Sequence, residues 1–180
     1  MIFSETTLLG AYIIDIEKMN DERGFFARVW DKNEFLKKGL DSKFVQSSIS
    51  KNKIRGTFRG MHYQTKPYEE SKLIRCSKGK IFDIIIDLRT NSKTFKKWIS
   101  IELSEDNYKM VYIPNGFAHG FQTLEDNTEV IYQISEDYKP ELSKGILWND
   151  SEFNIKLPLN ISMISQRDLS HRSFNQRYQK

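Results

Sequence analysis

The sequence predicts an all-β fold, an antiparallel sandwich or barrel with a few short helices. Three observations support this prediction: β-rich runs recur along the chain, turn-forming residues separate them, and apolar and polar residues alternate within several of them. The chain has 180 residues, of which 38% are hydrophobic and 13% aromatic. This is enough for one domain over residues 1–180 with a substantial core.

Ten strands are expected. They cover residues 11–16, 25–30, 43–50, 54–64, 72–77, 80–88, 97–103, 108–113, 117–123 and 129–135. The gaps between them contain turn formers such as Gly79, Asn91-Ser92 and Pro114-Asn115-Gly116. The short spacing favours antiparallel neighbours joined by tight turns.

Two short helices interrupt this pattern. The first fits between Asp31, which can cap it, and Gly39, which can end it, with Phe35 and Leu36 facing inward. The second is expected to begin near Ser165, so that the C-terminal tail of about residues 165–180 is partly helical.

Composition excludes several classes of function. The 28 Lys and Arg residues exceed the 24 Asp and Glu residues by four, and this modest excess suits a small anionic ligand better than nucleic acid. The single cysteine, Cys76, excludes an internal disulfide and indicates a reducing compartment. No apolar run approaches the roughly 20 residues of a membrane span, and residues 1–5 lack the features of a signal peptide. We therefore expect a cytoplasmic protein with no membrane or nucleic-acid partner.

Two polar residues fall on apolar strand faces. Lys72 shares one face of the 72–77 run with apolar residues, and Tyr132 does the same in the 129–135 run. Inward-facing polar groups cost free energy unless they are paired or used. The alternative is a Lys that reaches solvent at a strand end and a Tyr that only packs its ring.

The segment Arg59-Gly60-Met61-His62-Tyr63-Gln64 combines a titratable His with a phosphate-binding Arg in a strand-like run. His is well suited to proton transfer near neutral pH, so the segment suggests proton chemistry on an anionic substrate. Strict alternation puts Arg59 and His62 on opposite faces. We expect a bulge at Gly60 to re-aim one of them.

Further segments extend this motif in order along the chain. They are Asp21-Glu22-Arg23-Gly24-Phe25-Phe26, Lys72, Ile84-Ile85-Ile86-Asp87-Leu88-Arg89, Pro114 to Phe121, Tyr132 with Tyr138, Gly145 to Asp150, and Ser165-Gln166-Arg167-Asp168. Their order and spacing resemble the dTDP-4-dehydrorhamnose 3,5-epimerase family, a cupin-like jelly roll, from about residue 8 to about residue 168. The resemblance implies a cofactor-independent isomerase that inverts C3, C5 or both in a nucleotide-linked 4-keto sugar, and a homodimer with exchanged N-terminal strands.

The resemblance also implies four catalytic roles. His62 would be the base, and Asp168 would hold its ring and raise its basicity. Tyr132 would return a proton from the opposite face, and Lys72 would stabilise the enolate oxygen.

Ligand-binding roles follow in the same way. Arg23 and Arg59 would hold the pyrophosphate, and His119 would help to bind the sugar. Tyr138 would stack on the base, with Phe26 as a second apolar wall.

The chain departs from the family pattern at the nucleotide end of the ligand. Arg28 and Ser143 stand where Glu is usual, and Gln46 is followed by Ser48 where the family has Asn. Arg167, next to the predicted catalytic Asp, is grouped with these ligand-binding residues. Because an Arg fork matches O6 and N7 of guanine, we hypothesise a GDP-linked 4-keto sugar, such as a heptose, in place of a dTDP-linked one.

Simpler structural roles stay open for single residues. His119 could be a core histidine, Arg23 could pair with Asp21 or Glu22, and Asp168 could cap a terminal helix. Arg28 could bind phosphate or lie on the surface. His171 matches nothing in the family pattern and is expected on the solvated surface.

Two competing functions remain. One is a nucleotide-sugar 3,4-keto-isomerase, and the other is a non-catalytic module that binds sugar nucleotides. No metal site is expected, because His62 is followed by Tyr63-Gln64 and lacks the nearby second His of metal-binding cupins. The epimerase product would enter a surface polysaccharide.

Overall fold

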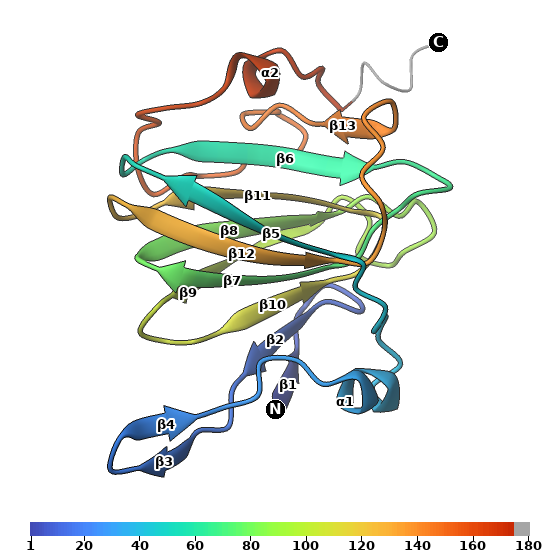
Figure 1. The fold of residues 1–180 in the computed structure, drawn as a ribbon. Coiled ribbons are helices and arrows are strands. Elements are labelled where there is room, and N and C mark those ends of the chain that lie inside the picture. The colour runs from blue at the N-terminus through green and yellow to red at the C-terminus, as the bar shows by residue number, and fades with distance from the viewer. Residues whose placement is uncertain (175–180) are drawn as a thin grey trace.

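The computed structural model describes residues 1–174 and has two antiparallel sheets packed face to face (Figure 1). The six-stranded sheet has the order β1 (Ile2–Glu5), β2 (Tyr12–Asp15), β10 (Met110–Ile113), β7 (Lys72–Lys78), β12 (Thr128–Ile134) and β5 (Gln46–Asn52). The five-stranded sheet has the order β13 (Ser143–Gly145), β6 (Phe58–Gln64), β11 (Phe117–Thr123), β8 (Lys80–Asp87) and β9 (Trp98–Ser104). The all-β jelly roll is confirmed, with two separate sheets in place of a closed barrel.

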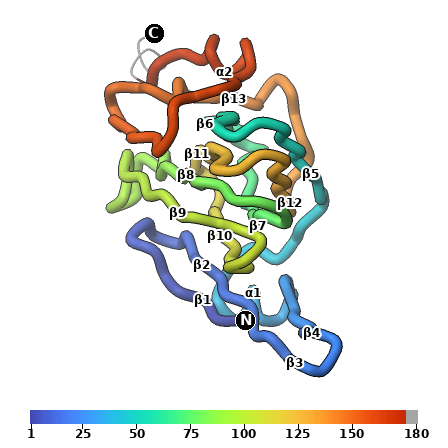
Figure 2. The backbone as a smooth tube through the Cα atoms, turned by 90° about the vertical axis from the view of Figure 1, so that its left-hand side faces the viewer, coloured from blue at the N-terminus to red at the C-terminus, as the bar shows by residue number. Residues whose placement is uncertain are grey.

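A third, two-stranded sheet stands apart from this sandwich. It is the hairpin of β3 (Met19–Asp21) and β4 (Gly24–Phe26), and it projects away from the two main sheets in both views of the chain (Figures 1 and 2). Every residue of its two strands is exposed. An isolated hairpin is at most marginally stable, and this one packs on the rest of the chain through Phe25, whose ring lies edge-on to Tyr108 with 5.1 Å between centroids.

Apolar side chains form three clusters that explain the layers. The space between the sheets is filled by residues such as Ile74, Ile85, Phe121 and Val130. The outer face of the five-stranded sheet is covered by the segment after β13, and the outer face of the six-stranded sheet by α1 and its flanks. Both faces of β8 are therefore buried, which accounts for its nearly unbroken apolar sequence.

Both expected helices are present, and both are short. Asp31 caps α1 (Lys32–Lys37) by accepting hydrogen bonds from two backbone N–H groups, and Phe35 is buried. Leu36 was expected to face inward but is 54% exposed, because a helix of fewer than two turns presents only a narrow stripe to the sheet. Ser165 caps α2 (Gln166–Leu169). The part of the expected helical tail beyond residue 174 lies outside the described residues.

One expected strand is wrong over most of its length, and three strands were not expected. The strand predicted at 25–30 ends at Phe26, where the β3–β4 pairing stops. Strands β1, β3 and β13 have three or four residues each, too few to give a clear alternation. No helix among residues 1–174 is long and apolar enough to cross a membrane.

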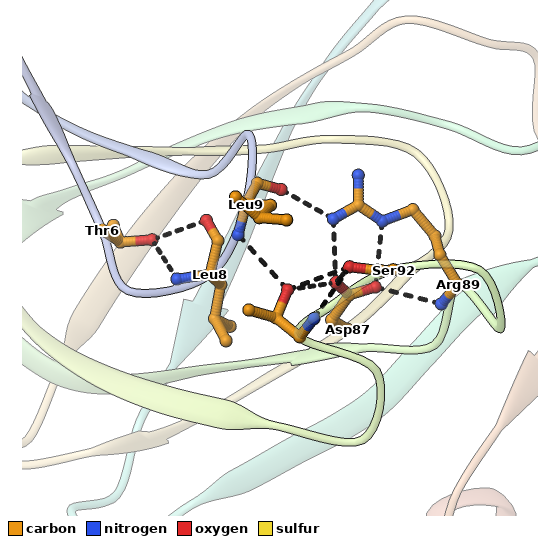
Figure 3. A network of polar contacts seen from close by, with 7 residues as sticks. Thr6, Leu8, Leu9, Asp87, Arg89 and Ser92 are labelled. Atoms are coloured by element: carbon orange, nitrogen blue, oxygen red, sulfur yellow. Dashed lines mark hydrogen bonds and ion pairs between the residues drawn. The ribbon is translucent and has the colours of Figure 1, made fainter.

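The end of β8 ties the N-terminal segment to the sandwich (Figure 3). The buried carboxylate of Asp87 accepts hydrogen bonds from the Arg89 guanidinium at 2.8 and 2.9 Å and from the hydroxyls of Ser92 and Thr94 at 2.6 Å. Arg89 in turn donates to the carbonyl of Leu9 at 2.6 Å. This network fixes the loop that leads into β2.

Candidate functional site

A cavity of about 300 Å³ opens between the two sheets, beyond the apolar cluster that fills the rest of that space. Its lining comes from both sheets and the adjoining loops: Gln46, Ser48, Ile49, Ser50, Arg59, His62, Glu70, Lys72, His119, Phe121, Tyr132, Ile134 and Tyr138. Eight of the fourteen residues predicted for catalysis or ligand binding are in this lining. The fold thus gathers residues that lie up to 92 positions apart, from Gln46 to Tyr138.

The expected irregularity at Gly60 is present. The register between β6 and β11 shifts between the positions of Arg59 and His62, so β6 holds an additional residue there. Gly60 has a φ of +141°, and a Cβ at this position would lie 2.5 Å from the Cα of Gly120. Because the bulge interrupts alternation, Arg59 and His62 both line the cavity.

His62 is hydrogen-bonded to Asp168, with 2.7 Å between Nε2 and the nearer carboxylate oxygen. Burial opposes charge on Asp168, but the hydrogen bond and charge of His62 outweigh it and lower the pKa of this carboxyl group. An ionised Asp168 accepts a proton-bearing Nε2, which leaves Nδ1 of His62 as the free, basic nitrogen. This pair can therefore accept a proton from a bound ligand.

Tyr132 lines the same cavity from the opposite sheet, on β12. Burial raises its pKa strongly, the Asp83 carboxylate raises it further, and Arg59 opposes the change. Its hydroxyl therefore keeps its proton at neutral pH and can donate it. The ring lies edge-on to His119, with 5.9 Å between centroids.

His119 has a buried carboxylate partner that the sequence analysis did not identify. Its Nε2 lies 2.7 Å from Asp83, and both side chains are almost fully buried. The second oxygen of Asp83 has no hydrogen-bond partner among the described residues. The signal was present in the sequence, since Asp83 interrupts the apolar run 81–86 at an inward-facing position.

Lys72 also has an acidic partner that was missed. Its Nζ lies 2.8 Å from Glu70, and both side chains are about nine-tenths buried beside the cavity. The spacing of two residues, which places side chains on one strand face, could have predicted this pair. The ammonium group predicted for enolate stabilisation is therefore held in place by an ion pair.

Several residues that are predicted to bind the nucleotide part of the ligand lie together at one side of the cavity. Gln46 and Ser48 line the cavity, and Tyr138 stands at its exposed side. Arg167 of α2 donates to Ser143 at 2.9 Å and approaches the Tyr138 hydroxyl at 3.5 Å. These contacts leave an exposed guanidinium beside an exposed aromatic ring.

Three residues predicted to bind the ligand lie away from the cavity of their own chain. Arg23 is on the β3–β4 hairpin, where its 89% exposed side chain pairs with Asp21 at 2.6 Å. Phe26 on the same hairpin is 64% exposed. Arg28 lies 3.7 Å from Asp31, at the start of α1.

The prediction that His171 lies on the solvated surface is wrong. Its side chain is only 12% exposed, because its ring lies against Gly145 of β13 and its Nε2 is 3.5 Å from Asp168. Its ring is edge-on to His62, with 5.7 Å between centroids. The one sequence signal was the three-residue spacing from Asp168, which brings two side chains together across a helical turn.

Among residues 1–174, one group of side chains has the residue types and proximity of a metal site. It consists of His62, Asp168 and His171, whose polar atoms lie within 4.8 Å of one another. Ligand atoms on a tetrahedral ion at about 2.0–2.1 Å lie roughly 3.3 Å apart. The 2.7 Å between His62 and Asp168 is shorter than that and is a hydrogen-bond distance. We therefore interpret the group as a hydrogen-bonded cluster.

Comparison with known proteins adds independent information. The family model described as dTDP-4-dehydrorhamnose 3,5-epimerase matches residues 5–176. A dTDP-4-dehydrorhamnose 3,5-epimerase from Methanothermobacter thermautotrophicus is 42% identical over 170 residues, covering 92% of this chain and 90% of the relative.

Two solved structures are similar over nearly the whole chain. The dTDP-4-dehydrorhamnose 3,5-epimerase of Elizabethkingia anophelis has a TM-score of 0.95 and 35% identity, covering 98% of each chain. The dTDP-6-deoxy-D-glucose-3,5-epimerase of Legionella pneumophila, in complex with dTDP-4-keto-L-rhamnose, has a TM-score of 0.90 and 31% identity, covering 97% of this chain and 93% of the other. Family match, sequence identity and fold agree over the same residues, so this chain belongs to the dTDP-4-dehydrorhamnose 3,5-epimerase family of carbohydrate isomerases.

Proposed function

We propose that this protein inverts C3 and C5 of a nucleotide-linked 4-keto sugar through an enolate. The observation that carries the proposal is the position of His62 and Tyr132, which line one cavity from opposite sheets. Inversion needs a base on one face of the sugar ring and a proton donor on the other. The 4-keto group acidifies the hydrogens on both neighbouring carbons, so no cofactor is required.

The steps follow from the protonation states of these groups. Nδ1 of His62 takes the proton from C3 or C5, and the C–H electrons form a C–C double bond while the carbonyl electrons move to O4. The ammonium of Lys72 stabilises the resulting enolate oxygen, a role often worth about 3 kcal/mol. The phenol of Tyr132 then gives its proton to the same carbon from the opposite face. Solvent later reprotonates Tyr132 and removes the proton from His62.

The pair of Asp168 and His62 supports the base assignment. The carboxylate stabilises the imidazolium that forms when His62 accepts a proton, and it fixes the ring orientation at 2.7 Å. His119, held by Asp83 at 2.7 Å, offers its remaining ring nitrogen to a hydroxyl of the sugar. Arg59 supplies positive charge for the pyrophosphate from the same strand as His62.

For the nucleotide, we propose thymidine diphosphate. The Legionella relative is described with dTDP-4-keto-L-rhamnose, and this chain is 31% identical to it. The competing GDP hypothesis depends on Arg28, which lies outside the cavity of its own chain and 3.7 Å from Asp31. Guanine recognition would require Arg28 to enter the cavity of a second subunit. Use of the product in a surface polysaccharide and a cytoplasmic location stay predictions from the sequence.

Incubation with candidate 4-keto nucleotide sugars in D2O tests the reaction directly. We expect deuterium at C3 and C5 and a ketone that stays at C4, as read by NMR. A ketone that moves to C3 would identify a keto-isomerase. Binding without deuterium uptake for any candidate would leave a binding module and refute the proposal. His62→Gln should abolish exchange, whereas Asp106→Asn, in the exposed turn after β9, should leave it unchanged.

Calorimetric binding of dTDP, GDP, UDP and CDP tests the nucleotide. We expect dTDP to bind most tightly and Arg28→Ala to change the order of affinities little. If GDP bound most tightly and Arg28→Ala removed this preference, the result would support the GDP hypothesis and contradict the proposal of dTDP.

A further inference from the structure

The ring of His171 lies against β13 of the five-stranded sheet, in the space left by the missing side chain of Gly145. Gly145 on β13 is paired with His62 on β6. A Cβ at Gly145 would overlap three ring atoms of His171, including Nε2. The imidazole is thus seated directly beside the strand pair that carries His62.

The polar atom at this position has no partner of its own. Nε2 of His171 is buried and makes no hydrogen bond among the described residues. The nearest acceptor is an oxygen of Asp168 at 3.5 Å, the same oxygen that Nε2 of His62 binds at 2.7 Å. A contraction of a few tenths of an ångström would make this a second hydrogen bond.

We propose that His171 is a positioning residue that shares the Asp168 carboxylate with His62 and thereby limits the basicity of His62. The proposal deepens the proposed function and rests on it only for the role of His62 as the base. His171 itself touches neither the cavity nor the reacting carbons, since it is absent from the cavity lining.

The effect follows from how charge is distributed over the carboxylate. A neutral imidazole that donates Nε2–H to Asp168 stabilises the carboxylate, so less of its negative charge is available to stabilise a protonated His62. His171 is neutral near pH 7, because burial and the neighbouring His62 lower its pKa more than Asp168 raises it. Without His171, more of the carboxylate charge would be available to stabilise a protonated His62.

This tuning matters because a general base works best with a pKa near the working pH. If His62 bound its proton too tightly, it would be protonated before the substrate arrived. Other charged or titratable groups surround the pair: Arg167 on α2 acts on His171, and the cavity that His62 lines is also lined by Arg59 on β6, Tyr132 on β12, Lys72 with Glu70 at β7, and His119 on β11, which is held by Asp83 on β8. These groups are the same in every variant below that changes only residue 171.

NMR titration of the His62 ring in the protein without substrate tests the proposal apart from catalysis. His171→Phe keeps a ring and removes the donor, so the pKa of His62 should rise by about half a unit to one unit. His171→Gln places an N–H close to the position of Nε2 and should restore a pKa near that of the unchanged protein. The acid limb of the pH profile for deuterium exchange should move in the same direction.

A double-mutant cycle separates this role from packing. In an Asp168→Asn background, His171→Phe should no longer shift the His62 titration, because its effect passes through the carboxylate. Gly145→Ala provides a second route, since it displaces the ring while leaving His171 in the sequence, and it should raise the His62 pKa as His171→Phe does.

An unchanged or lowered His62 pKa in His171→Phe would overturn the proposal. It would also be overturned if His171→Gln raised the His62 pKa as much as His171→Phe does, or if His171→Phe still raised it in the Asp168→Asn background. These outcomes are distinct from failure of the proposed function, which would appear as absence of deuterium exchange in the unmodified protein.

Discussion

Tyr132 and Asp83 illustrate how single residues set the direction of proton transfer. Burial raises the pKa of Tyr132, and the Asp83 carboxylate, held by His119 at 2.7 Å, raises it further. Burial favours the neutral phenol over the phenolate, so Tyr132 remains protonated throughout the neutral range. A protonated donor therefore stands on the β12 side of the cavity before any substrate binds.

Replacement of Tyr132 by Phe should separate two processes that the intact enzyme couples. Without the phenolic donor, product inversion should fall by about 10²–10⁴-fold, the usual contribution of a positioned acid or base. Deuterium exchange through His62 should fall less, since removal of the substrate proton does not need Tyr132. NMR of the sugar ring measures both quantities in one sample.

The matched control is Tyr12→Phe on β2, where the hydroxyl makes only a 3.4 Å contact to Glu5 on the surface. It should leave both exchange and inversion unchanged. Equal loss of exchange and inversion in Tyr132→Phe would contradict its role as the donor.

At this scale the sequence predicted residue types better than residue partners. His62, Lys72, Tyr132 and His119 all line the cavity, because inward-facing polar residues stand out against apolar strands. Asp83 is brought to His119 by pairing between β8 and β11, which sequence alone does not reveal. The pairing of His62 with Asp168 was therefore expected only from the family resemblance. The pairing of His119 with Asp83 depends on how the strands pair in the folded chain.

Among the elements, the end of β8 has the most concentrated polar contacts. Asp87 is completely buried, and its carboxylate accepts from Arg89, Ser92 and Thr94 (Figure 3). Burial alone would raise its pKa, but these donors outweigh burial and lower it. The turn after β8 and the loop at Leu9 are therefore held by one ionised group.

Asp87→Asn should destabilise the fold by about 3 kcal/mol at pH 7, because Arg89 loses its charged partner in a partly buried site. A carboxyl group whose pKa is lowered on folding stabilises the protein above its unfolded pKa of about 3.9. That contribution is lost as the pH falls through the lower, folded value. The difference between the two proteins should therefore shrink below about pH 4.

Urea unfolding between pH 7 and pH 3 measures this difference. Asp106→Asn, in an exposed turn, is the control and should change the free energy of unfolding by less than about 0.5 kcal/mol. A difference for Asp87→Asn that is independent of pH would contradict the assignment to an ionised carboxylate.

Element boundaries show what local patterns can and cannot predict. The long strands β6, β7, β8, β11 and β12 begin and end within one residue of their expected positions, except that β6 begins at Phe58, four residues later than expected. Strand β13 has three residues and exists because β6 is there to pair with it. The composition of the run 25–30 predicts a strand, but only Phe25 and Phe26 of this run belong to β4, which pairs with β3.

For the whole molecule, the exposed hairpin indicates an incomplete site. Phe26 and Met19 face each other across β3 and β4 and are 64% and 59% exposed. Exposed apolar residues on a projecting element are typical of interfaces. We propose that the protein is a homodimer in which this hairpin reaches the neighbouring cavity and brings Arg23 to the pyrophosphate.

Complementation between inactive variants tests this arrangement. If each site combines His62 of one chain with Arg23 of the other, co-expressed His62→Ala and Arg23→Ala chains should recover about a quarter of full activity by random pairing. The control pairs His62→Ala with Asp168→Ala, which belong to one site within one chain and should recover nothing. Absence of recovery in the first mixture would place the hairpin outside the neighbouring site.

The packing of the two sheets also determines which molecules can react. Sheets packed face to face are about 10 Å apart, a spacing set by side-chain size and common to β-sandwiches. Because the proposed base stands on β6 and the proposed acid on β12, this spacing sets the gap that a six-membered sugar ring must fill. Phe121 borders both the apolar cluster and the cavity, so its volume helps to set that gap. A side chain of the apolar core thus helps to select substrates by the thickness of their ring.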